Sequence, residues 1–343
     1  MAPIPGGLLH ANVLSCALFS AVCGSSAATA ATISTVAFPA LEKRGYDIRL
    51  TLGSLAAGGT LGILIPPSIT MIVYGVLVNA SVGRLFAGGV IPGIILSMMY
   101  MVYIWIKAVR NPRLAPREAR VPSRVVLLGL RDLWPVIILS TIILGGIFAG
   151  IATPTEAAAV GSSAALVIAL AMRGFSWRML RESLSSTLET TCMIMFIIVG
   201  ASMFSSFLAV SGAPRAFSAL LLGWHLPRLV MLSLIYFLYL FLGCFIDGLS
   251  MMIMTIPVVF PLVIALGFDP IWFGIILVIL IEVGLLTPPV GINLFVLQGI
   301  SKKPLIDVVS GSYPFFMVMI LGIIVFTVFP SLVLWLPDII FGP

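Results

Sequence analysis

Two pairs of adjacent prolines stand inside strongly hydrophobic segments, in GILIPPSI (Gly62–Ile69) and in GLLTPPVG (Gly284–Gly291). Each pair predicts a broken helix, because proline lacks an amide N–H and its ring clashes with the preceding turn. The carbonyl oxygens that end each incoming half-helix then lack an amide partner and can bind a cation such as Na⁺. Each outgoing half-helix begins at its prolines and directs a positive dipole end at the break, which suits an anionic substrate.

Three acidic side chains lie in apolar surroundings, namely Glu156 in TPTEAAA, Asp247 in CFIDGLS and Glu282 just before the second break. An acid at mid-membrane costs about 2.5 to 3.5 kcal/mol on insertion scales, so we expect a functional role for Asp247, with a structural hydrogen-bonding role as the alternative. For Glu282, an ion-site or substrate-site role and a structural role are both open. Helix capping explains Glu156 about as well as function does.

The composition is that of a polytopic membrane protein. Hydrophobic residues make up 61% of the chain and charged residues 9%, and the mean hydropathy is +1.22. The four cysteines show no CxxC or Cys/His spacing, which argues against a metal site or a disulfide framework. No nucleophile with a base and no HExxH motif is present, so the sequence does not indicate an enzyme or a cofactor other than a coupling ion.

The positive charges gather in short loops rather than on a nucleic-acid-binding surface. If the loops around residues 43–49, 107–131, 173–181 and 302–303 face the cytoplasm, 15 of the 18 Lys and Arg lie inside. That orientation makes residues 8–41 enter and return on the cytoplasmic side, as a re-entrant hairpin. It makes residues 229–266 do the same on the outer side.

An internal repeat relates the two halves. Adding 222 to the numbering carries Phe38-Pro39 onto Phe260-Pro261, Gly45-Tyr46-Asp47 onto Gly267-Phe268-Asp269, and Gly62 with its two prolines onto Gly284 with its own. The charge rule orients the halves oppositely, and inverted repeats with discontinuous helices are typical of secondary transporters. The predicted fold is therefore an all-α polytopic membrane protein with inverted repeats, two re-entrant hairpins and two discontinuous helices.

The predicted segments follow from that repeat. An incomplete first repeat, 1–106, holds hairpin 8–41, broken helix 50–80 and span 84–106, and a basic cytoplasmic loop follows at 107–132. The second repeat, 133–343, holds spans 133–151, 155–172 and 185–210, hairpin 229–266, broken helix 271–300 and terminal span 313–336.

Five segments in order resemble the large membrane subunit of TRAP transporters, the tripartite ATP-independent periplasmic type: GGLLHANVLSCALFSAVCGSSAATAATIS, LGILIPPSITMIVYGVL, GIATPTEAAAVG, FIDGLSMMIMTIPVVFPLVIALGFDP and GLLTPPVGINLFVLQGI. The resemblance implies a Na⁺-coupled, elevator-type importer of small organic anions, such as a dicarboxylate or a sugar acid, in the bacterial inner membrane. It implies two partners, a small membrane subunit and a periplasmic substrate-binding protein.

The same resemblance implies the site residues. Sodium would bind in the first half at Gly24, Ser25 and Ser26 with the backbone of Gly62, Ile65 and Pro67, and in the second half at Asp247, Gly248, Thr287 and Pro289. The substrate would lie between the two sodium sites, at Ser68, Thr70 and Asn293. The plainer interpretation of the segment from Gly24 onward is a helix-packing surface of small residues.

The sequence departs from this pattern at its start. The repeat leaves roughly 90 residues of the first half without a counterpart, so we expect an N-terminally truncated chain. Two alternatives are a non-functional fragment and an ion-coupled anion carrier of the same superfamily that works without a binding protein.

Overall fold

The computed structural model describes residues 4–116, 129, 131–212, 216, 223 and 226–342, and these residues form helices joined by short turns, without a strand. Half of the predicted basic loop at 107–132, namely 117–128 and 130, lies outside the described residues. The helices are α1 (Gly7–Cys23), α2 (Ser26–Lys43), α3 (Ile48–Leu64), α4 (Ile69–Val78), α5 (Val82–Arg110), α7 (Trp134–Phe148), α8 (Pro154–Ala171), α9 (Trp177–Ser211), α11 (Arg228–Gly243), α12 (Gly248–Ala265), α13 (Pro270–Leu285), α14 (Ile292–Ser301), α15 (Leu305–Val328) and α16 (Ser331–Phe341).

Six of the described segments are long and apolar enough to cross a membrane. They are Ile48–Val78, Val82–Arg110, Pro154–Ala171, Trp177–Leu208, Gly248–Ala265 and Leu305–Val328. A span needs about 20 apolar residues, because the hydrocarbon core is about 30 Å thick and a helix rises about 1.5 Å per residue.

The helices of the two halves recur at the spacing seen in the sequence. Helix α12 begins and ends 222 residues after α2, and α13 begins 222 residues after α3. Asp47 caps α3 by accepting from the Leu50 amide at 2.8 Å, and Asp269 caps α13 by accepting from the Ile271 amide at 2.7 Å. Each cap satisfies an amide that the first helical turn leaves without a partner.

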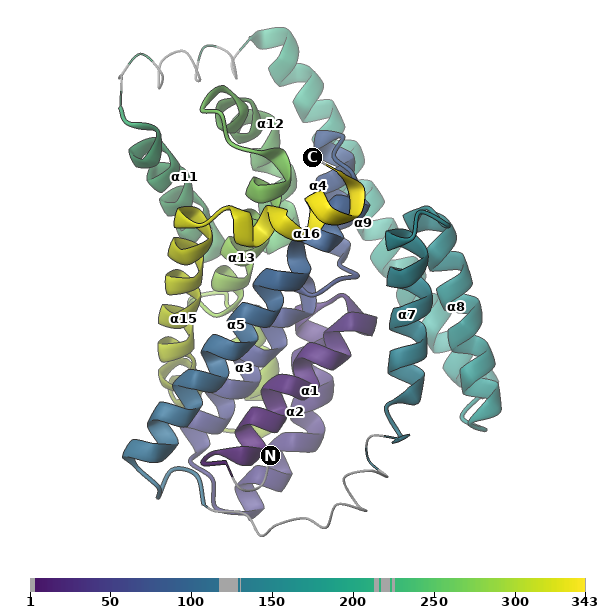
Figure 1. Cartoon of the computed structure of the whole chain (residues 1–343), viewed down its shortest axis with the longest axis vertical. Coiled ribbons are helices and arrows are strands. Elements are labelled where there is room, and N and C mark those ends of the chain that lie inside the picture. Colours follow the sequence, from purple (N-terminus) through teal and green to yellow (C-terminus); the bar gives the residue numbers. More distant parts are fainter. Residues whose placement is uncertain are drawn as a thin grey trace.

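The two hairpins start at opposite ends of the molecule. In Figure 1, α1 starts beside the N-terminus at the lower end, whereas α11 starts at the upper end. The α1–α2 turn is formed by Gly24 and Ser25, and the α11–α12 turn runs from Cys244 to Asp247. Each hairpin is followed by a helix that breaks, α3–α4 at Ile65–Ser68 and α13–α14 at 286–291.

The broken helices form the centre of the molecule. Every residue from Leu50 to Leu64 in α3 and from Ile271 to Gly284 in α13 is buried. Helix α9, by contrast, is mostly exposed, with only Ile194 and Ala201 buried among its described side chains, and it lies with α7 and α8 at one side of the bundle (Figure 1). A helix that is hydrophobic all round requires protein or lipid on every side, so α9 needs an apolar environment outside this chain.

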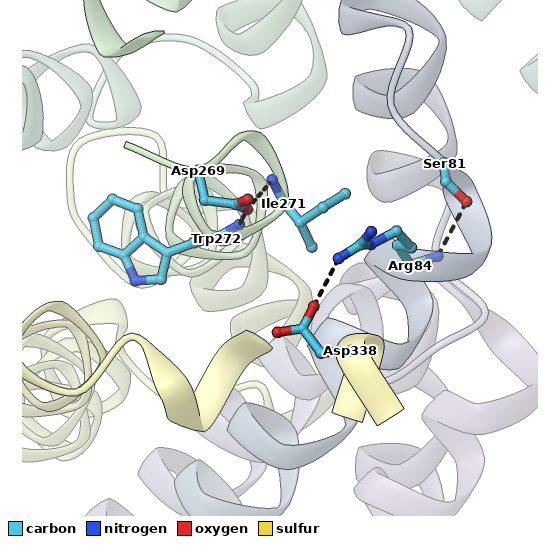
Figure 2. Close-up of polar contacts among 6 residues, drawn as sticks. All are labelled: Ser81, Arg84, Asp269, Ile271, Trp272 and Asp338. Atoms are coloured by element: carbon cyan, nitrogen blue, oxygen red, sulfur yellow. Dashed lines mark hydrogen bonds and ion pairs between the residues drawn. The ribbon is translucent and has the colours of Figure 1, made fainter. Parts of the chain in front are cut away.

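The terminal segment differs from the single span expected at 313–336. Helix α15 ends at Val328, and α16 starts after Pro330, which has no amide N–H with which to continue α15. Helix α16 packs across α5, and Arg84 near the start of α5 donates to Asp338 of α16 at 2.7 Å (Figure 2). The chain beyond Val328 therefore turns back onto the bundle.

The contact between α3 and α15 yields a packing prediction. A Cβ on Gly53 would overlap the Gly311 carbonyl, so Gly53→Ala should force the two helices apart and lower stability by about 1 to 3 kcal/mol. Thermal unfolding in detergent measures the loss. The matched control is Gly299→Ala, where a Cβ meets nothing within 4 Å. Equal melting temperatures for the two variants would contradict the close approach.

Candidate functional site

The tip of the first hairpin lies directly against the first break. Gly24 has φ +66°, and a Cβ there would come within 2.8 Å of the Pro67 carbonyl oxygen. A Cβ on Gly62 would come within 2.6 Å of the Ser25 carbonyl oxygen. Glycine is needed at both positions, because any other residue would push the hairpin away from the broken helix.

Side-chain hydroxyls hold this arrangement together. The Ser26 hydroxyl donates to the Thr60 carbonyl at 3.1 Å, which joins α2 to the last turn of α3. Ser68 caps α4 by accepting from the Met71 amide at 3.3 Å. Since Pro66 and Pro67 have no N–H, the helix cannot supply the usual partners for the carbonyls of Gly62 and Ile63. Carbonyl oxygens and hydroxyls thus meet where the sequence predicts the first sodium site.

The second hairpin also lies against the second break, but the polar groups at this contact differ from those at the first. The Val290 amide donates to the Cys244 carbonyl at 3.1 Å, and the backbones of Gly243 and Gly284 approach closely enough that a Cβ on Gly284 would come within 3.0 Å of Gly243. A small cavity of about 10 Å³ lies between hairpin and break. Its volume is about that of one water-sized sphere, and its lining includes Asp247, Gly248, Val290 and Gly291.

Asp247 is exposed and caps α12, accepting from the Leu249 amide at 3.0 Å and the Ser250 amide at 3.2 Å through one carboxylate oxygen, Oδ1. Thr287 and Pro289 do not line the cavity. The Thr287 hydroxyl instead donates to the Val283 carbonyl of its own helix at 2.6 Å. The structure thus brings Asp247 and Gly248 to the break and turns the Thr287 hydroxyl away from them.

The predicted substrate residues are buried. Ser68 and Thr70 lie at the start of α4, and Asn293 lies in the first turn of α14, so all three are near half-helix starts. The side-chain oxygen and nitrogen of Asn293 have no hydrogen-bond partner in the described part of the chain. Buried amides are normally satisfied, so an unpartnered pair next to a break is the mark expected of a ligand contact. No hydrogen bond between described residues joins Asn293 to Ser68 or Thr70.

Two further polar groups lie in the buried centre. The Tyr100 hydroxyl of α5 lies 3.5 Å from the Thr60 hydroxyl, and Glu282 of α13 is fully buried. The sequence singled out Glu282 but neither Tyr100 nor Thr60, although the repeat carries Thr60 onto Glu282 and could have marked Thr60. Glu156 forms a capping box with Thr153 at the start of α8, which supports its structural interpretation.

Comparison with known proteins gives the family. The model of the tripartite ATP-independent periplasmic transporter, DctM component, matches residues 2–332. The chain belongs to the DctM family of TRAP transporter large permeases. It is 36% identical to the C4-dicarboxylate TRAP transporter large permease protein DctM of Vibrio cholerae over 98% of this chain and 79% of that protein. It is 32% identical to the sialic acid TRAP transporter large permease protein SiaM of the same organism, over 99% and 79% of the two chains.

The fold has a solved relative as well. The crystal structure of the Alcanivorax borkumensis YdaH transporter superposes with a TM-score of 0.56, at 14% identity, over 97% of this chain and 86% of that one. The prediction of an all-helical protein with several membrane spans is confirmed. As a TRAP permease the chain is a multi-pass protein of the bacterial inner membrane and a transporter subunit rather than an enzyme.

Asn293 offers a test that separates a ligand contact from a structural role. Asn293→Leu removes two unpartnered buried polar atoms, so stability should stay equal or rise. Uptake should nevertheless fall by at least about tenfold, the cost of losing one or two hydrogen bonds to a charged ligand. Thermal unfolding and uptake of a radiolabelled C4-dicarboxylate and radiolabelled sialic acid by cells expressing the full transporter measure the two effects. A stable variant with unchanged uptake of both probes would remove Asn293 from the substrate site.

Proposed function

We propose that this TRAP permease imports a small organic anion by Na⁺-coupled secondary transport, together with a small membrane subunit and a periplasmic substrate-binding protein. The relatives named for C4-dicarboxylates and for sialic acid support a carboxylate-bearing substrate. The two hairpins, re-entrant from opposite sides of the membrane, and the two broken helices form inverted repeats that move the site across the membrane in an elevator-type cycle.

The observation that carries this proposal is the pairing of each hairpin tip with a broken helix. Irregular backbone at membrane depth is tolerated only where it is buried in protein or lines a cavity, because unpaired polar groups facing lipid cost several kcal/mol each. The first break lies against Gly24 and Ser25, and at the second break Val290 and Gly291 line the cavity that Asp247 also lines, whereas Pro288 and Pro289 are exposed. Each break offers oxygen atoms in a confined space, which suits a small hard cation.

The two sodium sites differ in their ligands. The first uses the hairpin tip at Gly24, Ser25 and Ser26 with the backbone of Gly62, Ile65 and Pro67. The second uses Asp247 and Gly248, which line the cavity, together with backbone carbonyls of Thr287 and Pro289, which belong to the same break but do not line the cavity. The substrate lies between them, where Ser68, Thr70 and Asn293 stand near the positive ends of α4 and α14.

Asp247→Asn tests the coupling. Asparagine caps a helix about as well as aspartate does, so α12 should keep its start and the protein its abundance. Loss of the negative charge should raise the Na⁺ concentration for half-maximal uptake several-fold. The measurement is initial uptake of a radiolabelled C4-dicarboxylate and of sialic acid into proteoliposomes holding the complete transporter and its binding protein, as external Na⁺ is varied.

The matched control is Glu189→Gln, which neutralises an exposed carboxylate on α9 without touching either break. It should leave the Na⁺ dependence as in the wild type. An unchanged Na⁺ half-saturation in Asp247→Asn would make Asp247 a purely structural cap. Na⁺-independent uptake by the wild type would overturn the proposed function.

A further inference from the structure

The carboxyl group of Glu282 is the most isolated polar group at the centre of the fold. Its side chain is 0% exposed, and neither oxygen has a hydrogen-bond partner among the described residues. It stands in the last turns of α13, shortly before the second break, and α13 packs against both α3 and α5. Glu282 is not one of the sodium or substrate residues proposed above, so those sites do not account for its buried carboxyl group.

Within the described part of the chain, no basic side chain pairs with Glu282. Helix α5, which packs against α13, carries the phenol of Tyr100, and a phenol supplies no positive charge. The basic side chains on the helices that pack against α13 stand in first or last turns, toward the ends of the bundle, and no described group of three or more His, Cys, Asp or Glu could hold a metal. The charged and titratable groups on these neighbouring helices are Arg49 on α3, Tyr74 on α4, Arg84, Tyr100, Tyr103, Lys107 and Arg110 on α5, Arg228, Tyr236 and Tyr239 on α11, Asp307 and Tyr313 on α15 and Asp338 on α16, with Asp247 and Lys302 capping α12 and α14.

Several of those charges are already engaged with each other. Arg49 pairs with Asp307 at 2.9 Å, and Arg84 pairs with Asp338 at 2.7 Å. Figure 2 shows the second pair beside the start of α13, and Glu282 lies 12 residues further along that helix, about 18 Å away at 1.5 Å per residue. An ionised carboxylate at Glu282 would thus be buried without a counter-charge or a donor, which is strongly unfavourable.

We propose that Glu282 is a proton-binding site, which holds a proton whenever the second broken helix is packed as in this structure. The proton comes from water and leaves a neutral carboxylic acid, so no counter-ion is required. Because Glu282 precedes the break by about one turn, the packing of α13 and α14 depends on that proton. This inference depends on the fold and not on sodium coupling, so the two can fail separately.

Thermal unfolding of the detergent-solubilised protein as a function of pH tests the site. The folded protein would hold a proton that the unfolded chain releases above about pH 4.3, so wild-type stability should fall as pH rises. Glu282→Gln has nearly the same shape and is always neutral, so its melting temperature should exceed the wild-type value by a margin that widens from about pH 5.5 to about pH 8.5. Glu189→Gln should follow the wild type.

Three results would overturn the proposal. One is a difference in melting temperature between Glu282→Gln and the wild type that does not change with pH. Another is a widening margin in Glu189→Gln of the same size as in Glu282→Gln. The third concerns variants that do not fold: if both Glu282→Gln and the apolar Glu282→Met fail to accumulate while the wild type does, an ionised carboxylate is required there.

Discussion

The need to satisfy backbone polar groups away from water governs this structure. A continuous helix satisfies its own amides and carbonyls, whereas a helix broken inside the membrane leaves several without partners. Two pairs of prolines create that problem. The first break is largely buried against the tip of its hairpin, and the second lies beside a small cavity at the tip of the other hairpin, although Pro288 and Pro289 are exposed. The position of the hairpins, the glycines at the contacts and the central place of α3 and α13 all follow from it.

The two halves meet the same constraint with different chemistry. In the first half, glycine allows the backbones to touch, and the Ser26 hydroxyl bonds the Thr60 carbonyl. In the second half, a carboxylate stands at the hairpin tip, and a small cavity separates it from the break. The repeat therefore preserves the geometry, while the residues at equivalent positions differ: neutral hydroxyls in the first half, Ser25 and Thr60, and acids in the second, Asp247 and Glu282.

The elements that the sequence predicted are those with local signals. Prolines marked both breaks, because a proline acts within one turn of its own position. Asp47, Asp269 and Asp247 cap helix starts in the structure, and such caps are also a local signal. The predicted end of the terminal span, residue 336, was wrong, since α15 ends at Val328. Hydrophobic residues continue on both sides of Pro330, so the sequence pattern does not reveal the break there. The direction of the Thr287 hydroxyl could not be predicted, because it depends on the side-chain rotamer. In the structure this hydroxyl donates to the Val283 carbonyl in the preceding turn.

The neighbours of Glu282 could not be predicted for a different reason. Tyr100 comes from α5, far from Glu282 in the sequence, and only the packing of α3, α5 and α13 brings the two near each other. Local patterns contain no information about such long-range contacts. For the same reason the family resemblance suggested a set of sodium residues at each break, while only the structure shows that Asp247 and Gly248 line the cavity at the second break and that Thr287 and Pro289 do not.

The central claim is that each broken helix holds one coupling ion, and the ratio of ²²Na⁺ uptake to substrate uptake tests it most directly. The ratio is measured in proteoliposomes that contain the complete transporter, with matched initial rates for the ion and for a radiolabelled C4-dicarboxylate or sialic acid. Two matched breaks predict at least about two sodium ions for each substrate molecule. A ratio of one or less would contradict the claim that both breaks are ion sites.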